Sequence, residues 1–178
     1  MTQSRSRSRP AQVPRNAGGE AGGRGRSDAR LVQDVMSPDL ACCFPDASLI
    51  DVARLMVAHD CGEIPVLDPE TKAPIGVVTD RDIVCRTIAE RKNPLDLHAS
   101  DCMSAPVITV TPDMPLDRCC ALFEEHMIRR APVVDDRGRC CGVVSQADVA
   151  TKASPELSAE MLHQVSQPAR PTTTAATR

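Results

Sequence analysis

The sequence is nearly devoid of aromatic residues, with two Phe and neither Tyr nor Trp in 178 residues. Platforms that bind single-stranded nucleic acid stack the bases on aromatic side chains, so this shortage argues against such a platform. The sequence also has no apolar run of about 18 residues, so we expect no membrane-spanning helix. The core of the fold must be built from Val, Leu, Ile, Met, Ala and Cys.

The formal net charge is small, -3, but the charged residues are unevenly spread. Residues 1–30 hold seven Arg against two acidic residues, whereas the remainder holds 14 basic and 22 acidic residues. An acidic body is a poor surface for duplex DNA, so we do not expect it to bind nucleic acid. Because the first 30 residues contain no apolar stretch of the kind found in secretory leaders, we expect a cytoplasmic protein.

The middle of the chain repeats itself with a shift of 67 positions, which becomes 66 after a deletion in a turn. DVMS at 34–37 matches DCMS at 101–104, and GVVT at 76–79 matches GVVS at 142–145. Two copies are too few for an open solenoid, so a closed pair is predicted. We divide the chain into a disordered Arg-rich arm (1–27), two repeats (28–95 and 96–153), a C-terminal helix (154–165) and a disordered tail (166–178).

Each copy has the pattern strand, helix, strand, strand, helix, which predicts an α/β (α+β) fold of two β-α-β-β-α repeats. Pro-Asp at 45–46 and at 112–113 indicates the entry to the first helix of each copy. The expected strands are 40–44, 64–67 and 75–79 in the first copy and 107–110, 131–134 and 140–145 in the second.

The end of the third strand carries the most informative residues. Thr79 ends a buried strand, and Asp82 lies one turn into the following helix. A hydroxyl beside the free N–H groups of a helix N-terminus suits a phosphate, a carboxylate can accept both hydrogen bonds of a ribose diol, and Arg81 could add a cation. The second copy has Ser145 and Asp148 at these positions. The alternative is that each pair only caps a helix, as a Thr/Ser-x-x-Asp box does.

The ordered set of motifs, found twice, resembles the cystathionine-β-synthase-type (CBS) domain: Met-Ser, Pro-Asp before a helix, Pro-Val-hydrophobic-Asp, then Gly-Val-Val-Thr/Ser-x-x-Asp. The resemblance implies two repeats packed as a pseudo-twofold pair, with clefts that bind adenosine ligands. By the same resemblance Thr79 and Ser145 contact phosphate, and Asp82 and Asp148 hold the ribose. The backbone of Ile64-Pro65 and Ala131-Pro132 is then expected to border the base.

Basic residues are unequal between the copies. The second copy has Ala147 where the first has Arg81, so we rank the Asp82 site first. Arg130, which follows Arg129 just before Pro132, could face a phosphate or could be a solvated helix end favoured by the helix dipole.

Nine Cys occur without the C-x₂-C spacing of metal sites, so core filling is favoured over a metal or redox role, and no metal is expected. His59 and His126 recur at the end of the first helix of each copy and are interpreted in the same way. No catalytic constellation is evident, so we do not expect an enzyme.

The sequence therefore predicts a regulatory protein that binds an adenosine nucleotide and modulates a partner or its own oligomeric state. AMP, ADP or ATP are the expected ligands, with S-adenosylmethionine or NADH as further candidates and no prosthetic group. The alternatives are a ligand-free adaptor or a nucleic-acid-associated protein that acts through its basic arm. The expected partners are a protein target and a second copy of the chain, since symmetric dimers are the commonest oligomers. The candidate dimer interface is formed by Leu55, Met56, Leu122 and Phe123, and packing in the core of the chain is the alternative for the same four residues.

Overall fold

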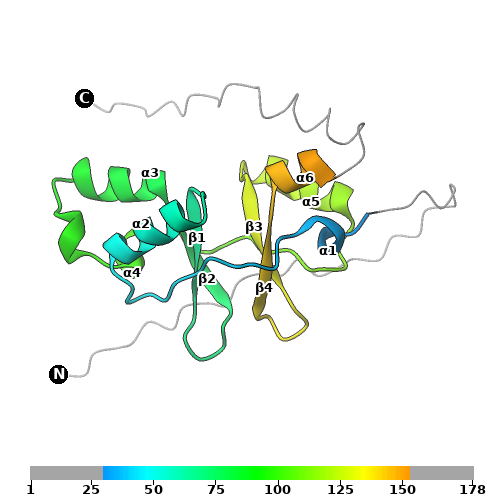
Figure 1. The fold of residues 1–178 in the computed structure, drawn as a ribbon, viewed down its shortest axis with the longest axis horizontal. Helices are drawn as coiled ribbons and strands as arrows, with labels where there is room; N and C mark the ends of the chain where they lie inside the picture. Colours follow the sequence, from blue (N-terminus) through cyan, green and yellow to red (C-terminus); the bar gives the residue numbers. More distant parts are fainter. Residues whose placement is uncertain (1–29, 153–178) are drawn as a thin grey trace, which may run out of the picture.

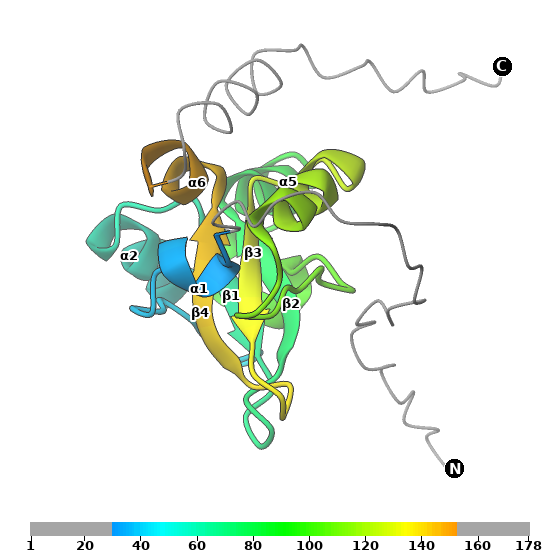
Figure 2. The ribbon, with the colours of Figure 1, turned by 90° about the vertical axis from the view of Figure 1, so that its right-hand side faces the viewer.

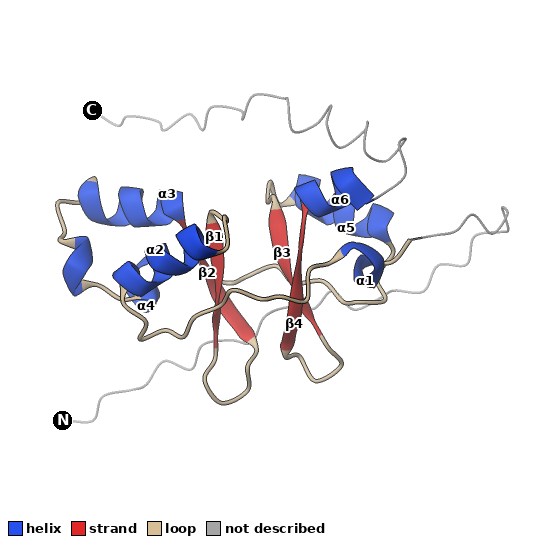
Figure 3. Cartoon of the chain, viewed as in Figure 1, coloured by secondary structure: helices blue, strands red, loops and turns tan. Residues whose placement is uncertain are grey.

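Two antiparallel β-hairpins, one from each repeat, stand side by side at the centre of the molecule (Figures 1 and 3). β1 (Glu63–Leu67) pairs with β2 (Pro74–Thr79), and β3 (Arg130–Val134) pairs with β4 (Cys140–Ser145). The computed structural model describes residues 30–152. The arm, the C-terminal helix and the tail predicted for residues 1–27, 154–165 and 166–178 thus lie outside the described residues.

The helices cover the outer sides of the two hairpins (Figure 1). α2 begins at Leu49 because the Ser48 Oγ accepts a hydrogen bond from the Asp51 N–H at 3.1 Å, which satisfies a free donor of the first turn. The elements are α2 (Leu49–Ala58), α3 (Asp80–Ile83) with the π-helical turn η1 (Val84–Ile88), α5 (Leu116–Glu125) and α6 (Gln146–Lys152). The mixed fold of two repeats is therefore confirmed.

The strands expected at 40–44 and 107–110 are much shorter than predicted. Each is a single parallel bridge, Cys43 to Val66 and Val110 to Val133. Pro65 and Pro132 have no backbone N–H, so neither residue can donate to these edge segments. Their carbonyls instead accept from Cys43 N at 3.0 Å and from Val110 N at 3.1 Å.

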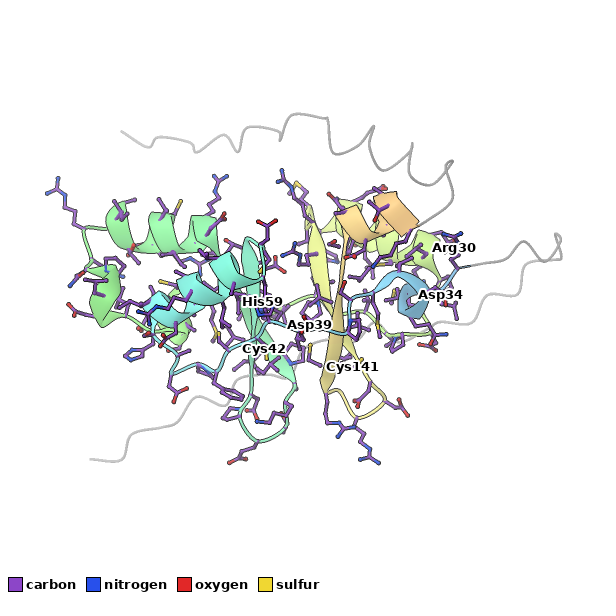
Figure 4. All side chains as sticks on the ribbon, viewed as in Figure 1. Arg30, Asp34, Asp39, Cys42, His59 and Cys141 are labelled. Atoms are coloured by element: carbon purple, nitrogen blue, oxygen red, sulfur yellow. The ribbon has the colours of Figure 1, made fainter. Side chains whose placement is uncertain are left out.

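The repeats exchange their first segments. Ser37, near the start of the first repeat, bridges Val143 on β4 of the second, and Ser104 of the second repeat bridges Val77 on β2 of the first. The short helix α1 (Val32–Val35) accordingly lies beside the second repeat in both views (Figures 1 and 2), and Arg30 and Asp34 lie there too (Figure 4). Each packed half of the molecule therefore combines the hairpin of one sequence repeat with the first segment of the other.

Two apolar cores follow this exchange. Val32 and Val35 are buried with Phe123 in the core of the second repeat, whereas Ala99 of helix α4 (Ala99–Cys102) is buried in the core of the first. A short 3₁₀ helix, η2 (Pro94–Asp96), leads from η1 toward α4. Each core is thus completed by residues from the other repeat.

The expected dimer interface is largely core. Met56 and Leu122 are each 8% exposed and Phe123 is 1% exposed, and all three pack inside the cores of the chain. The side chain of Leu55 is half-buried against the core of the first repeat. Helical periodicity shows which residues share an apolar face but not whether that face meets the chain's own sheet or a partner, so the prediction selected core residues. Within residues 30–152, no helix has the length and apolar character needed to cross a membrane.

Candidate functional site

A cleft of about 910 Å³ lies where the two repeats meet, at the ends of β2 and β4. It brings together five of the ten site residues expected from the sequence: Thr79, Arg81, Asp82, Arg130 and Ser145. The other five do not line this cleft: Ile64, Pro65, Ala131, Pro132 and Asp148. Ile64 and Ala131 are fully buried in their cores, and the carbonyls of Pro65 and Pro132 are occupied by the bridges at the sheet edges.

Thr79 and Asp82 form a complete capping box at the start of α3. The Thr79 Oγ1 accepts from the Asp82 N–H at 3.0 Å, and the Thr79 N–H donates to Asp82 Oδ2 at 3.0 Å. The Thr79 hydroxyl also donates to Oδ2 at 2.7 Å. These bonds hold Oδ2, whereas Oδ1 lies outside the capping box, 3.4 Å from the Ser104 hydroxyl that donates to it and 3.2 Å from the Arg86 guanidinium. The capping role weighed from the sequence is therefore present, and the second oxygen is held by side chains at the edge of the cleft.

Ser145 and Asp148 repeat this box in the second repeat, with Ser145 Oγ donating to Asp148 Oδ2 at 2.5 Å. Here Oδ1 is occupied, because the Lys152 Nζ lies 3.0 Å from it. Burial alone would raise the pKa of Asp148, but the hydrogen bond from Ser145 and the ammonium group of Lys152 outweigh it and lower that pKa. Asp148 is thus held as an ion paired within the chain.

Arg86 is a site residue that sequence reasoning missed. Its guanidinium donates to the carbonyls of Cys102 and Met103 and to the Ser104 Oγ, each at 2.7 Å. It also lies 3.2 Å from Asp82 Oδ1. Arg86 therefore joins the exchanged segment to the helix that carries Asp82 and orients that carboxylate.

Lys152 is the counterpart of Arg86, since it donates to the Val35 carbonyl at 2.8 Å as well as contacting Asp148. A basic residue at the same position of both repeats was the signal that could have revealed this role. Arg is better suited to the first repeat because its planar group reaches several acceptors at once.

Glu63 is a second residue that the sequence did not single out. It is the first residue of β1, lines the cleft, and has an Oε1 that is buried without a hydrogen-bond partner among residues 30–152. Burial raises the pKa of Glu63 to about 7, with Arg130 opposing this shift and Asp82 adding to it. The cleft therefore holds a carboxyl group that titrates near neutral pH.

Charge differs between the walls of the cleft. The first repeat contributes Glu63, Asp80, Asp82 and Arg81, whereas the charged residues of the second are Arg129 and Arg130. Both arginines line the cleft, which favours the phosphate-facing alternative over a solvated helix end for this pair. An anionic group would be attracted to the wall of the second repeat.

The cysteines are spread over both repeats, as Figure 4 shows for Cys42 and Cys141. Burial raises the pKa of the Cys119 thiol to about 12 and that of Cys43 to about 11, so both stay protonated in their cores. Among residues 30–152 there is no group of three His, Cys, Asp or Glu side chains that could hold a metal. His59 and His126 are exposed at the ends of α2 and α5, so these two are not core residues.

Comparison with curated proteins identifies relatives that match about two thirds of this chain. An uncharacterized protein of Methanopyrus kandleri, MK0525, is 36% identical over 66% of this chain, and the chain spans 60% of its length. The CBS domain-containing protein YhcV of Bacillus subtilis is 34% identical over 67% of this chain and 82% of that protein.

Solved structures share the fold. The CBS domain pair of protein MJ0100, in complex with 5′-methylthioadenosine and S-adenosyl-L-methionine, has a TM-score of 0.61 and 26% identity over 69% of this chain and 94% of that one. CBSX2 in complex with AMP has a TM-score of 0.60 and 26% identity over 69% of this chain and 95% of that one. The family model for the CBS domain matches residues 32–86 and 99–154, which together exceed half of the sequence. The chain therefore belongs to the CBS domain family, with two CBS domains in tandem.

Proposed function

We propose that the protein is a regulatory module that binds an adenosine ligand in the cleft between its repeats and passes the bound state to a partner. The observation that carries this proposal is the convergence of Thr79, Arg81 and Asp82 with Arg130 and Ser145 in one cleft of about 910 Å³, large enough for a nucleotide. Solved relatives that contain AMP, S-adenosylmethionine or 5′-methylthioadenosine support the class of ligand. The proposed role involves binding and no catalytic step.

The contacts suggest how the ligand binds. The ribose diol would contact Asp82 Oδ1, the oxygen outside the capping box, in place of the long 3.4 Å hydrogen bond from the Ser104 hydroxyl. A phosphate would lie against Arg129 and Arg130 on the opposite wall, with Ser145 as a hydroxyl donor. Asp148 would contribute little, because it does not line the cleft.

Calorimetric titration with AMP, ADP, ATP, S-adenosylmethionine and NADH tests the proposal. Asp82→Asn should lower affinity about tenfold, since a hydrogen bond to a charged acceptor contributes roughly 1.5–3 kcal/mol. Asp148→Asn is the matched control and should change affinity less than about twofold. If Asp82→Asn lowered the melting temperature without changing affinity, Asp82 would be only a helix cap.

A ligand-free adaptor is the second candidate, and the capping boxes favour it because they give both aspartates a structural role. Failure of all five compounds to bind would establish this alternative over the first. Nucleic-acid binding through the Arg-rich arm concerns residues outside the described part of the chain. It would give a salt-dependent, sequence-independent signal in the same kind of titration.

We also propose a homodimer that forms through α2 rather than through the residues expected from the sequence. A groove of about 570 Å³ runs along α2, and Val57 (84% exposed) and Leu95 (64%) stand beside it. Its one charged lining residue, Arg54, is paired with Asp51 at 3.1 Å, so two copies of the groove would not repel each other strongly. A second copy of the chain is therefore the proposed occupant.

Light scattering at micromolar concentration tests the homodimer. Val57→Glu should give a monomer, whereas Glu124→Gln, at the matched position of α5, should leave the dimer intact. A monomeric mass for the unchanged chain would overturn the proposal.

A further inference from the structure

The carboxyl group of Glu63 has an unusual place in the cleft. Glu63 and Arg130 are equivalent residues of the two repeats, since each is the first residue of its hairpin and pairs with the last residue of the partner strand, Thr79 or Ser145. They therefore present opposite charges from opposite walls. No ion pair joins them within the described residues, and Glu63 Oε1 stays buried without a partner.

The charges around Glu63 come from several elements. Asp80, Arg81 and Asp82 belong to α3, Arg129 precedes β3 and Arg130 begins it, while the neighbouring parts of β4 and α6 contribute no charged residue to the cleft. Arg86 of η1 adds a further guanidinium behind the lining residues, 3.2 Å from Asp82 Oδ1. When Glu63 is ionised, three carboxylates face four guanidinium groups, a net charge of one positive unit. When Glu63 is protonated, the net charge rises to two positive units.

This balance determines which ligand the cleft accepts. A phosphate placed against Arg130 must approach the Glu63 carboxylate, which repels it while it is ionised. An uncharged nucleoside meets no such repulsion. The pKa of Glu63, raised to about 7 by burial, makes both states accessible near neutral pH.

We propose that Glu63 is a specificity-determining residue that ranks adenosine ligands by charge: ionised, it disfavours a 5′-phosphate relative to the uncharged nucleoside, and protonated, it removes that preference. Binding of AMP therefore takes up a proton from solvent onto the Glu63 carboxylate, whereas binding of adenosine does not. The proposal rests on the proposed adenosine-binding function of the cleft.

The test is calorimetric titration of the full chain with AMP and with adenosine at pH 6.5, 7.5 and 8.5. AMP affinity should fall with rising pH, by up to about tenfold per unit for one linked proton, and adenosine affinity should stay constant. Glu63→Gln should abolish this fall and bind AMP more tightly than the unchanged chain at pH 8.5. The phosphate of AMP titrates with a pKa of about 6 in both proteins, so their difference isolates Glu63.

Asp80→Asn is the matched control, because it removes an exposed carboxylate of the same cleft and should keep the pH dependence. The heat of AMP binding in two buffers of different ionisation enthalpy counts the proton without any variant. A proton uptake of zero would overturn the proposal, and so would equal pH slopes for Glu63→Gln and the unchanged chain. Binding of AMP in the same titrations would still support the cleft as an adenosine site. Failure of both ligands to bind would overturn the proposed function, and this inference with it.

Discussion

The two repeats have the same framework but differ on the surfaces that they expose. Both have a capping box, a glycine where the exchanged segment crosses, and a basic residue that holds that segment. In the cleft, however, Glu63 of one repeat faces Arg130 of the other. On the outer helices, Val57 of α2 corresponds to Glu124 of α5. Residues that hold the backbone are thus alike in the two repeats, whereas residues that line the cleft or lie on the outer helices differ.

The largest expected difference concerns Gly76 and Gly142, each of which packs against the first segment of the other repeat. A Cβ at position 142 would lie 2.9 Å from the backbone oxygen of Ser37, which has little room to move. At position 76 the closest atom is the Sδ of Met103, at 2.8 Å, in a flexible side chain, and the equivalent backbone oxygen, that of Ser104, lies slightly farther away at 3.1 Å. Gly142→Ala should therefore lower the free energy of unfolding by about 1–3 kcal/mol, and Gly76→Ala by less. Urea denaturation measures both, and equal losses would show that the two crossings tolerate crowding alike.

The next comparison sets Arg86 against Lys152. Arg86 makes three hydrogen bonds to the exchanged segment and Lys152 makes one. Arg86→Ala should lower the free energy of unfolding by about 1–2 kcal/mol, more than Lys152→Ala, since each such bond contributes roughly 1 kcal/mol net. Thermal and urea unfolding provide the measurement. Because Arg86 also orients Asp82, its loss should weaken AMP binding, which loss of Lys152 should not.

The smallest effect concerns Glu63, whose counterpart in the second repeat is Arg130 and not an acid. The pKa of Glu63 is raised in the folded state, so folding binds the proton more tightly and stability falls as pH rises from about 4.5 to about 7. Glu63→Gln removes this loss and should raise the free energy of unfolding by about 1 kcal/mol at pH 8, with little change at pH 4. Chemical denaturation at both pH values tests the sign, and a variant that is less stable at pH 8 would contradict it.

Much of this arrangement could be predicted from the sequence, because the repeat aligned the residues that hold the backbone. Thr79 and Asp82 were identified as both a cap and a candidate site, and the capping bonds are present. The exchange of segments was not predicted, since a match between 34–37 and 101–104 shows equivalence but not which sheet each segment joins. The role of Arg86 was missed for the same reason, because its acceptors lie 16 to 18 residues away in the exchanged segment.

Glu63 could not have been recognised by type alone. A single Glu before Ile-Pro-Val resembles an ordinary solvated strand end, and only the burial of its carboxyl group makes it unusual. The expected interface failed on similar grounds, because Phe123 fits a core and a partner surface equally well by hydrophobicity. Burial depends on tertiary packing, which a local pattern does not contain.

The exchanged first segment also constrains the order in which the chain can fold during synthesis. Ser37 pairs with Val143, and Val35 accepts from Lys152, so these contacts span more than a hundred residues. When the first repeat has emerged from the ribosome, β4 and α6 have not yet been synthesised. Residues 31–37 must therefore wait, with Val32 and Val35 exposed, until almost the whole described part of the chain has emerged. Contacts of such long sequence separation slow folding, so the last step of maturation should be the docking of the part made first.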